Sequence, residues 1–132
     1  MKQFLIVATG GAGGDLQALV AAALAVRGRG HRIAFLGDRS VGRALSALGV
    51  DVQVLPPELD LGPRLAGAVR EAMVATGGDI VGAGPIVEQR LAQWSGEVAE
   101  PISRAIAKRR RDALVTSLFG VEVVQRAAPP CP

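Results

Sequence analysis

The fold is decided by the opening of the chain, where Phe4-Leu5-Ile6-Val7-Ala8 is followed by Thr9-Gly10-Gly11-Ala12-Gly13-Gly14-Asp15. The first run is continuously apolar and has β-branched members, which is typical of a strand covered on both faces. The second is a glycine-rich turn that ends on a carboxylate, and an apolar run with helical spacing begins at Asp15. A strand, a glycine-rich turn and a helix together predict a ligand-binding corner of an α/β sheet.

The composition is that of one globular domain. The chain has 132 residues, of which 49% are hydrophobic, so it can bury a core. No segment reaches the roughly 18 apolar residues that a membrane span requires. The first apolar run is also too short for a signal peptide, and we therefore expect a cytoplasmic protein.

Several site classes are disfavoured by residue content. The single cysteine, Cys131, excludes an internal disulfide framework. It lies far in sequence from the single histidine, His31, and no ligand-spaced carboxylates accompany either residue, so we expect no metal site. Aromatic residues make up only 3% of the chain and basic residues form one short run, which argues against a nucleic-acid surface.

Strands alternate with helices along the chain. We expect strands at residues 3–8, 32–36, 50–55 and 113–116, and helices at 15–26, 41–48, 63–75, 86–110 and 119–128. Pro101 is expected to kink the fourth helix or to start a new segment. Residues 56–85 have the loosest pattern, with a glycine-rich stretch after the third helix.

This alternation predicts a Rossmann-like α/β fold, a parallel sheet of strand order 3-2-1-4 flanked by helices. The order reverses between the first and fourth strands, and ligands of such sheets bind outside the carboxyl ends of the strands at that point. The loops 9–15 and 117–120 should therefore face each other across one crevice.

The glycine-rich turn does not fit the common nucleotide motifs. In a dinucleotide fingerprint beginning at Gly11, the third glycine would fall on Leu16. Asp38, just after the second strand, could bind a ribose, but Asp15 places a carboxylate where a pyrophosphate would sit. No Gly-Lys-Ser/Thr follows the glycines, which excludes a P-loop.

Asp15 has two compatible interpretations. A carboxylate at the start of a helix caps backbone N–H groups and suits the helix dipole, which is worth about 1 kcal/mol. A carboxylate at the predicted crevice can also act as a general base toward a hydroxyl.

Two stretches resemble a known family. The opening Gly13-Gly14-Asp15-Leu16-Gln17, with the helix end Arg27-Gly28-Arg29-Gly30-His31, is similar to the N-terminus of family 1 glycosyltransferases of the GT-B fold, above all bacterial antibiotic, sterol and rhamnolipid-type transferases. Residues 112–120 resemble the fourth strand and following turn of that family. Ala18 stands where the family often has proline.

The resemblance implies a site and a reaction. Asp15 would deprotonate an acceptor hydroxyl, which then attacks the anomeric carbon of a nucleotide sugar with inversion. Gly13, Gly14, Ser117, Leu118 and Phe119 would line the crevice for a small or lipophilic acceptor, although Phe119 can equally belong to the core. No cofactor is implied beyond the nucleotide sugar, which is a co-substrate, and residues 56–85 would form the variable acceptor-binding region.

The resemblance also implies that something is missing. A GT-B enzyme has two such domains and binds the nucleotide sugar mainly to the second. Residues 1–132 would be one acceptor-binding domain, incomplete at its C-terminus and inactive without a donor domain. The fourth strand would then be an exposed edge that favours self-association or coverage by the C-terminal tail.

Two alternatives stay open. One is a flavin- or nucleotide-binding domain, since flavoprotein decarboxylases also open with a strand, a Thr-Gly loop and a helix ending in Arg-Gly-His. The chain lacks their Ala-Ala-Tyr-Lys turn, however. The other is a non-catalytic module that needs a partner chain.

Three further features are expected to be structural. His31 lies in a turn at the end of the sheet opposite the crevice. Lys108-Arg109-Arg110-Arg111 follows a helix and suits its negative end as a solvated face, with contact to an anionic membrane surface as the lesser alternative. Trp94 lies near Leu91 and Val98 at helical spacing, which favours core packing over a sugar platform.

Overall fold

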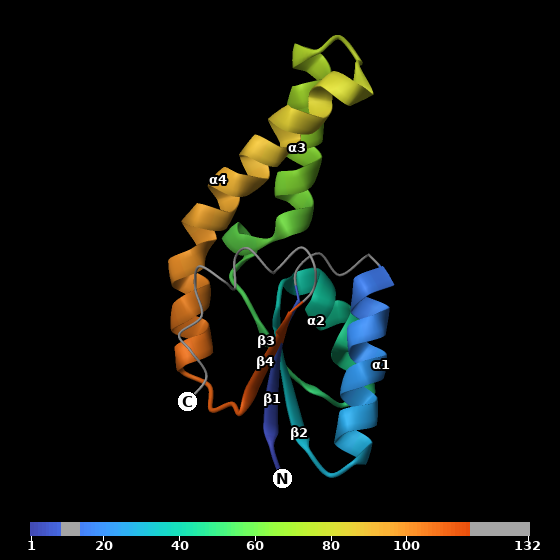
Figure 1. Ribbon diagram of the computed structural model, residues 1–132, viewed down its shortest axis with the longest axis vertical. Coiled ribbons are helices and arrows are strands. Elements are labelled where there is room, and N and C mark those ends of the chain that lie inside the picture. The colour runs from blue at the N-terminus through green and yellow to red at the C-terminus, as the bar shows by residue number, and fades with distance from the viewer. Residues whose placement is uncertain (9–13, 117–132) are drawn as a thin grey trace.

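A parallel sheet forms the centre of the molecule. The computed structural model describes residues 1–8 and 14–116 (Figure 1). The strands are β1 (Gln3–Ala8), β2 (Arg32–Gly37), β3 (Asp51–Val54) and β4 (Ala113–Thr116), and their order is β3-β2-β1-β4. All three pairings are parallel, so the predicted fold class and strand order are confirmed.

Helices cover both faces of this sheet. They are α1 (Gly14–Gly28), α2 (Arg39–Leu45), α3 (Leu61–Ala75) and α4 (Ile80–Ala107), with short 3-10 turns at Ser46–Leu48 and Pro57–Leu59. In Figure 1, α1 and α2 lie on one side of the strands and the lower half of α4 lies on the other. The predicted helix 119–128 lies outside the described residues.

The core consists of two apolar clusters, one on each face of the sheet. Because side chains alternate along a strand, Leu5 and Val7 of β1 face α4, whereas Ile6 and Ala8 face α1. The first cluster holds Val98, Ile102 and Ile106 of α4, and the second holds Leu16 and Ala23 of α1. This two-sided burial explains the continuous apolar runs of β1 and β2.

Residues 76–85 differ from the predicted loose stretch. After a four-residue turn, α4 begins at Ile80, six residues earlier than expected, and continues through Pro85 and Pro101. Asp79 starts it, because its side chain accepts a hydrogen bond from the Val81 N–H at 3.1 Å. The turn itself uses Gly77 and Gly78, whose φ angles of 62° and 91° suit glycine.

Helices α3 and α4 form a hairpin that extends beyond the sheet (Figure 1). Ion pairs join the two helices on the surface, Arg64 with Glu97 and Arg90 with Glu71. The hairpin leaves the body of the molecule at the carboxyl ends of the strands (Figure 1). Most of the region expected to be variable and loop-like is therefore helical.

Candidate functional site at the carboxyl ends of the strands

The strand pairing fixes where a crevice can form. Ala8, the last residue of β1, pairs with Gly37 of β2, and Val7 pairs with Thr116, the last residue of β4. The carboxyl ends of these three strands therefore lie side by side. The direction of strand order reverses between β1 and β4, which is where sheets of this kind bind ligands.

The elements that carry the predicted site residues meet at this edge. Gly14 and Asp15 are the first two residues of α1, which follows β1, and Ser117 directly follows β4. The backbone of Asp15 is described, whereas its side chain is not. Gly13, Ser117, Leu118 and Phe119 lie outside the described residues, so the roles given to these residues remain predictions.

Leu16 occupies the position that a dinucleotide fingerprint gives to its third glycine. Its side chain is 7% exposed and belongs to the cluster that also contains Ala8 and Phe35. In the fingerprint that glycine lets helix and strand approach closely, whereas here a leucine side chain fills the space. This packing supports the sequence argument against a dinucleotide.

The Asp38 carboxylate is engaged in hydrogen bonds within the protein. It is 1% exposed and caps α2, because its Oδ1 accepts hydrogen bonds from the Val41 N–H at 3.1 Å and from the Ser40 hydroxyl at 2.6 Å. Gly37, just before it, has no room for a side chain, since a Cβ there would lie 2.8 Å from the Ala8 carbonyl oxygen. The carboxylate that a ribose would need is therefore a buried helix cap.

An ion pair that the sequence does not reveal holds this edge together. Arg39 Nε donates to Asp60 Oδ2 at 2.7 Å, which ties the start of α2 to the residue before α3. The Asp60 side chain is 8% exposed and that of Arg39 is 52% exposed. The two residues are 21 positions apart, so no short-range pattern points to the pair.

His31 lies at the opposite end of the sheet, as predicted. Its Nδ1 accepts a hydrogen bond from the Lys2 N–H at 3.2 Å, and its ring lies 5.7 Å from that of Phe4 between centroids. These contacts fasten the turn before β2 to the start of β1. Because Nδ1 accepts a hydrogen bond, the neutral ring carries its proton on Nε2.

The basic run 108–111 is less solvated than predicted. Arg109 Nη1 pairs with Asp51 Oδ2 at 2.7 Å, and its Nε donates to Gln53 Oε1 at 2.9 Å. Arg111 is 8% exposed and donates from Nη1 to the Ile106 carbonyl at 3.0 Å, at the end of α4. The run therefore does complement the negative end of the helix, but two of its arginines bind protein groups.

Trp94 is a core residue, as expected. It is 4% exposed and lies in the cluster between the sheet and α4.

Among the described residues no group of three His, Cys, Asp or Glu side chains could hold a metal ion. Within residues 14–107, no helix combines the length and the apolar character needed to cross a membrane.

Comparison with known proteins supports a fold. No family model and no curated protein matches the chain. Among solved structures, MurG from Acinetobacter baumannii matches with a TM-score of 0.54 at 12% sequence identity. The match covers 96% of this chain and 32% of the MurG chain, so this chain spans about a third of that protein.

The likeness to MurG concerns architecture. MurG is a GT-B glycosyltransferase of family 28, and this chain has the Rossmann-like fold of one half of such a protein. The expected GT-B fold is thereby supported. The narrower resemblance to family 1 rests on the sequence stretches alone.

Proposed function

We propose that this chain is the acceptor-binding domain of an inverting glycosyltransferase, which moves a sugar from a nucleotide sugar to a hydroxyl of a small or lipophilic acceptor. The observation that carries the proposal is the GT-B-like architecture over 96% of the chain. The position of Asp15 in the fold also supports the proposal. Asp15 is the second residue of α1, which begins beside the point where the strand order reverses.

Asp15 would act as the general base. Its carboxylate would take the proton of the acceptor hydroxyl as the oxygen attacks the anomeric carbon, and the nucleotide would leave from the opposite side of the sugar. The glycines before it would give the acceptor clearance. The stretch Gly13–Gln17 supports the finer assignment to a family 1 type of transferase.

The acceptor would bind between this loop and the residues after β4. Ser117, Leu118 and Phe119 would contribute the second wall. The α3–α4 hairpin rises from the same end of the sheet (Figure 1), in a position to shape access to the crevice. The nucleotide sugar would bind to a second domain, outside these 132 residues.

The test is a transfer assay on the longest natural protein that contains this chain. The assay combines a panel of nucleotide sugars with steroid alcohols and hydroxy fatty acids as acceptors. Asp15→Asn should lower kcat by about 10²–10⁴-fold, the usual contribution of a positioned base, with little change in the acceptor KM. The transfer rate of the unaltered protein should rise with pH as the Asp15 carboxyl group loses its proton. The residual rate of Asp15→Asn should lack that rise.

Asp79→Asn is the matched control. Asp79 directly precedes α4, and its side chain caps that helix by accepting a hydrogen bond from the Val81 N–H. Asparagine caps helices about as well as aspartate. This variant should transfer sugar within about twofold of the unaltered protein. Equal kcat values for Asp15→Asn and the unaltered protein would reduce Asp15 to a helix cap, and robust transfer by the 132-residue chain alone would contradict the need for a second domain.

A further inference from the structure

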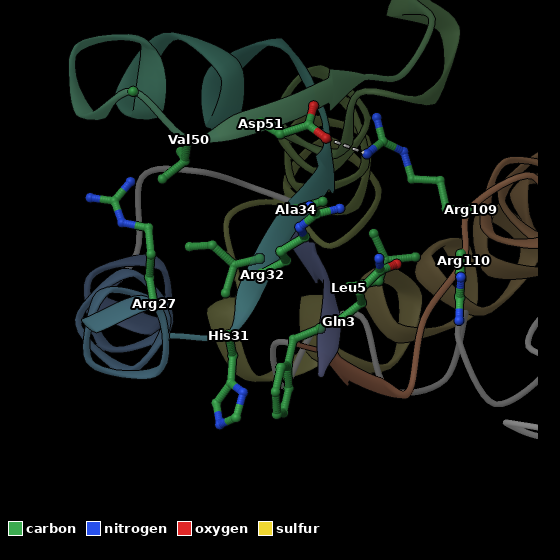
Figure 2. Close-up of a pocket in the computed structure, with 13 residues that line it drawn as sticks. Gln3, Leu5, Arg27, His31, Arg32, Ala34, Val50, Asp51, Arg109 and Arg110 are labelled. Atoms are coloured by element: carbon green, nitrogen blue, oxygen red, sulfur yellow. Dashed lines mark hydrogen bonds and ion pairs between the residues drawn. The ribbon is translucent and has the colours of Figure 1, made fainter. Parts of the chain in front are cut away.

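A cavity of about 490 Å³ lies at the amino ends of the strands, away from the crevice discussed above (Figure 2). It is lined by the first residues of β1, β2 and β3, by the end of α1 and by the segment that follows α4. Arginine is the most frequent residue in its lining, and four arginines from three parts of the chain meet there: Arg27, Arg32, Arg109 and Arg110.

The charge of this lining is poorly balanced. The lining contains four arginines and one carboxylate, that of Asp51, which is already paired with Arg109 at 2.7 Å. The nearby Asp112 is also engaged, since its Oδ2 accepts a hydrogen bond from the Gln3 N–H at 2.7 Å. The formal net charge of the whole chain is +3, so this one cavity carries an excess as large as that of the entire molecule.

Three of the arginines have unused donors. Within the part of the chain that the structure describes, Arg27 donates only to the Leu48 carbonyl, at 3.5 Å. The side chains of Arg32 and Arg110 are exposed and make no hydrogen bond or ion pair with any residue that the structure describes. In Figure 2, Arg32 lies between Arg27 on one side and Arg109 on the other.

The rest of the lining is largely apolar. Phe4, Ile33, Ala34 and Val50 are half-buried and contribute hydrocarbon surface beside the guanidinium groups. Pockets of about 300–1,000 Å³ with an apolar lining and a few convergent polar groups are typical of small-molecule sites. Arginine binds phosphate oxygens with two parallel N–H donors, which gives both energy and orientation.

We propose that this cavity binds an organic phosphate, a small molecule that carries one or more phosphoryl groups on an apolar or ring-containing body. Arg32 and Arg110 bind the phosphoryl oxygens, and the apolar residues contact the body of the ligand. The site is separate from the proposed acceptor crevice, because it lies at the amino ends of strands whose carboxyl ends form that crevice (Figure 1).

A recessed site fits the geometry better than a membrane surface does. Binding to an anionic bilayer needs several basic side chains free on one outer face. Of the run Lys108–Arg111, only Lys108 and Arg110 are exposed, because Arg109 is paired with Asp51 and Arg111 is buried. Arg32 and Arg110, which have no protein partner among the described residues, both belong to the cavity lining.

Calorimetric titration of the 132-residue chain tests this proposal with adenosine triphosphate, inorganic tripolyphosphate and vesicles that contain phosphatidylserine. Adenosine triphosphate should bind saturably at one site, and tripolyphosphate more weakly because it has no apolar body. The double variant Arg32→Gln/Arg110→Gln should bind adenosine triphosphate at least about tenfold more weakly, through the loss of two charge-assisted contacts.

The matched control is Arg43→Gln/Arg70→Gln, which removes the same charge from exposed arginines of α2 and α3. Its affinity should stay within about twofold of the unaltered chain, since screened charges outside the site contribute little. Equal losses in both double variants, absence of saturable binding, equal affinity for tripolyphosphate, or binding to vesicles alone would each overturn the proposal. Sugar-transfer activity enters none of these measurements, so the outcome is independent of the role of Asp15.

Discussion

At the scale of single residues, two buried carboxylates are held by hydrogen-bond donors. Asp38 and Asp60 are both buried, and both are held by donors from the start of α2: the Val41 N–H for the first and the Arg39 guanidinium for the second. Buried carboxylates of this kind are stable only when paired or hydrogen-bonded. Their position beside the predicted crevice makes them supports of that edge.

Trp94 Nε1 and Arg111 Nε are exceptions to this rule among the described residues. The Trp94 indole Nε1 is buried and has no hydrogen-bond partner in residues 1–8 and 14–116. An orphaned buried donor costs about 1–3 kcal/mol. Trp94→Phe removes that donor and keeps most of the apolar ring, so the free energy of unfolding should change by less than about 1 kcal/mol.

Trp94→Ala provides the contrast and should lower the free energy of unfolding by about 3–5 kcal/mol, because it leaves a cavity in the cluster under α4. Urea denaturation followed by circular dichroism measures both changes, since Trp94 is the only tryptophan and its replacement removes the fluorescence signal. A loss in Trp94→Phe as large as that in Trp94→Ala would show that the indole N–H has a stabilising partner after all.

At the scale of elements, α4 has a buried C-terminal part and a more exposed N-terminal part. Its C-terminal half covers the sheet with Val98, Ile102 and Ile106, all fully buried. Its N-terminal part extends into the hairpin, where Ile80 and Val81 are 78% and 85% exposed. Figure 1 shows α4 changing direction along its length, as interior prolines such as Pro101 cause helices to do.

This division predicts unequal effects of one substitution made twice in the same helix. Ile102→Ala should lower the free energy of unfolding by about 2–5 kcal/mol, because its side chain is 0% exposed. Ile80→Ala should change it by less than about 0.5 kcal/mol, because the side chain already faces solvent. Thermal or urea unfolding checks both values, and a comparable loss at Ile80 would mean that the tip of the hairpin is packed against another part of the protein.

At the scale of the whole molecule, the sequence sufficed for the sheet and fell short for the hairpin. The strands are short apolar or alternating runs, and those of β1, β2 and β3 end close to a glycine or a proline. Right-handed crossovers then leave one strand order. For residues 76–85, four glycines and Pro85 argue locally against a helix. The buried alanines of both helices, Ala72 and Ala83 among them, let α3 and α4 pack closely and outweigh that local preference.

The candidate site, too, is only partly predictable from the sequence. Its position followed from strand order, which local patterns determine. The Arg39–Asp60 pair and the arginine-lined cavity could not be found from the sequence, because each joins residues that only the completed sheet brings together. The prediction of a solvated basic run fails at Arg109 for the same reason, since Asp51, with which Arg109 pairs, lies 58 positions earlier in the chain.

The last expectation concerns association of whole molecules through the sheet. Among the described residues, β4 pairs only with β1, and Val115 is 38% exposed. An edge strand with free backbone groups pairs readily with another copy, and a lysine on such a strand prevents this. Light scattering should therefore show a mass that rises with protein concentration, and Val115→Lys should hold the mass at that of a monomer. Val74→Lys, which adds the same charge at a valine that is 79% exposed on the hairpin, should leave the association unchanged. If Val74→Lys abolished association and Val115→Lys did not, the hairpin and not the sheet edge would be the contact between copies.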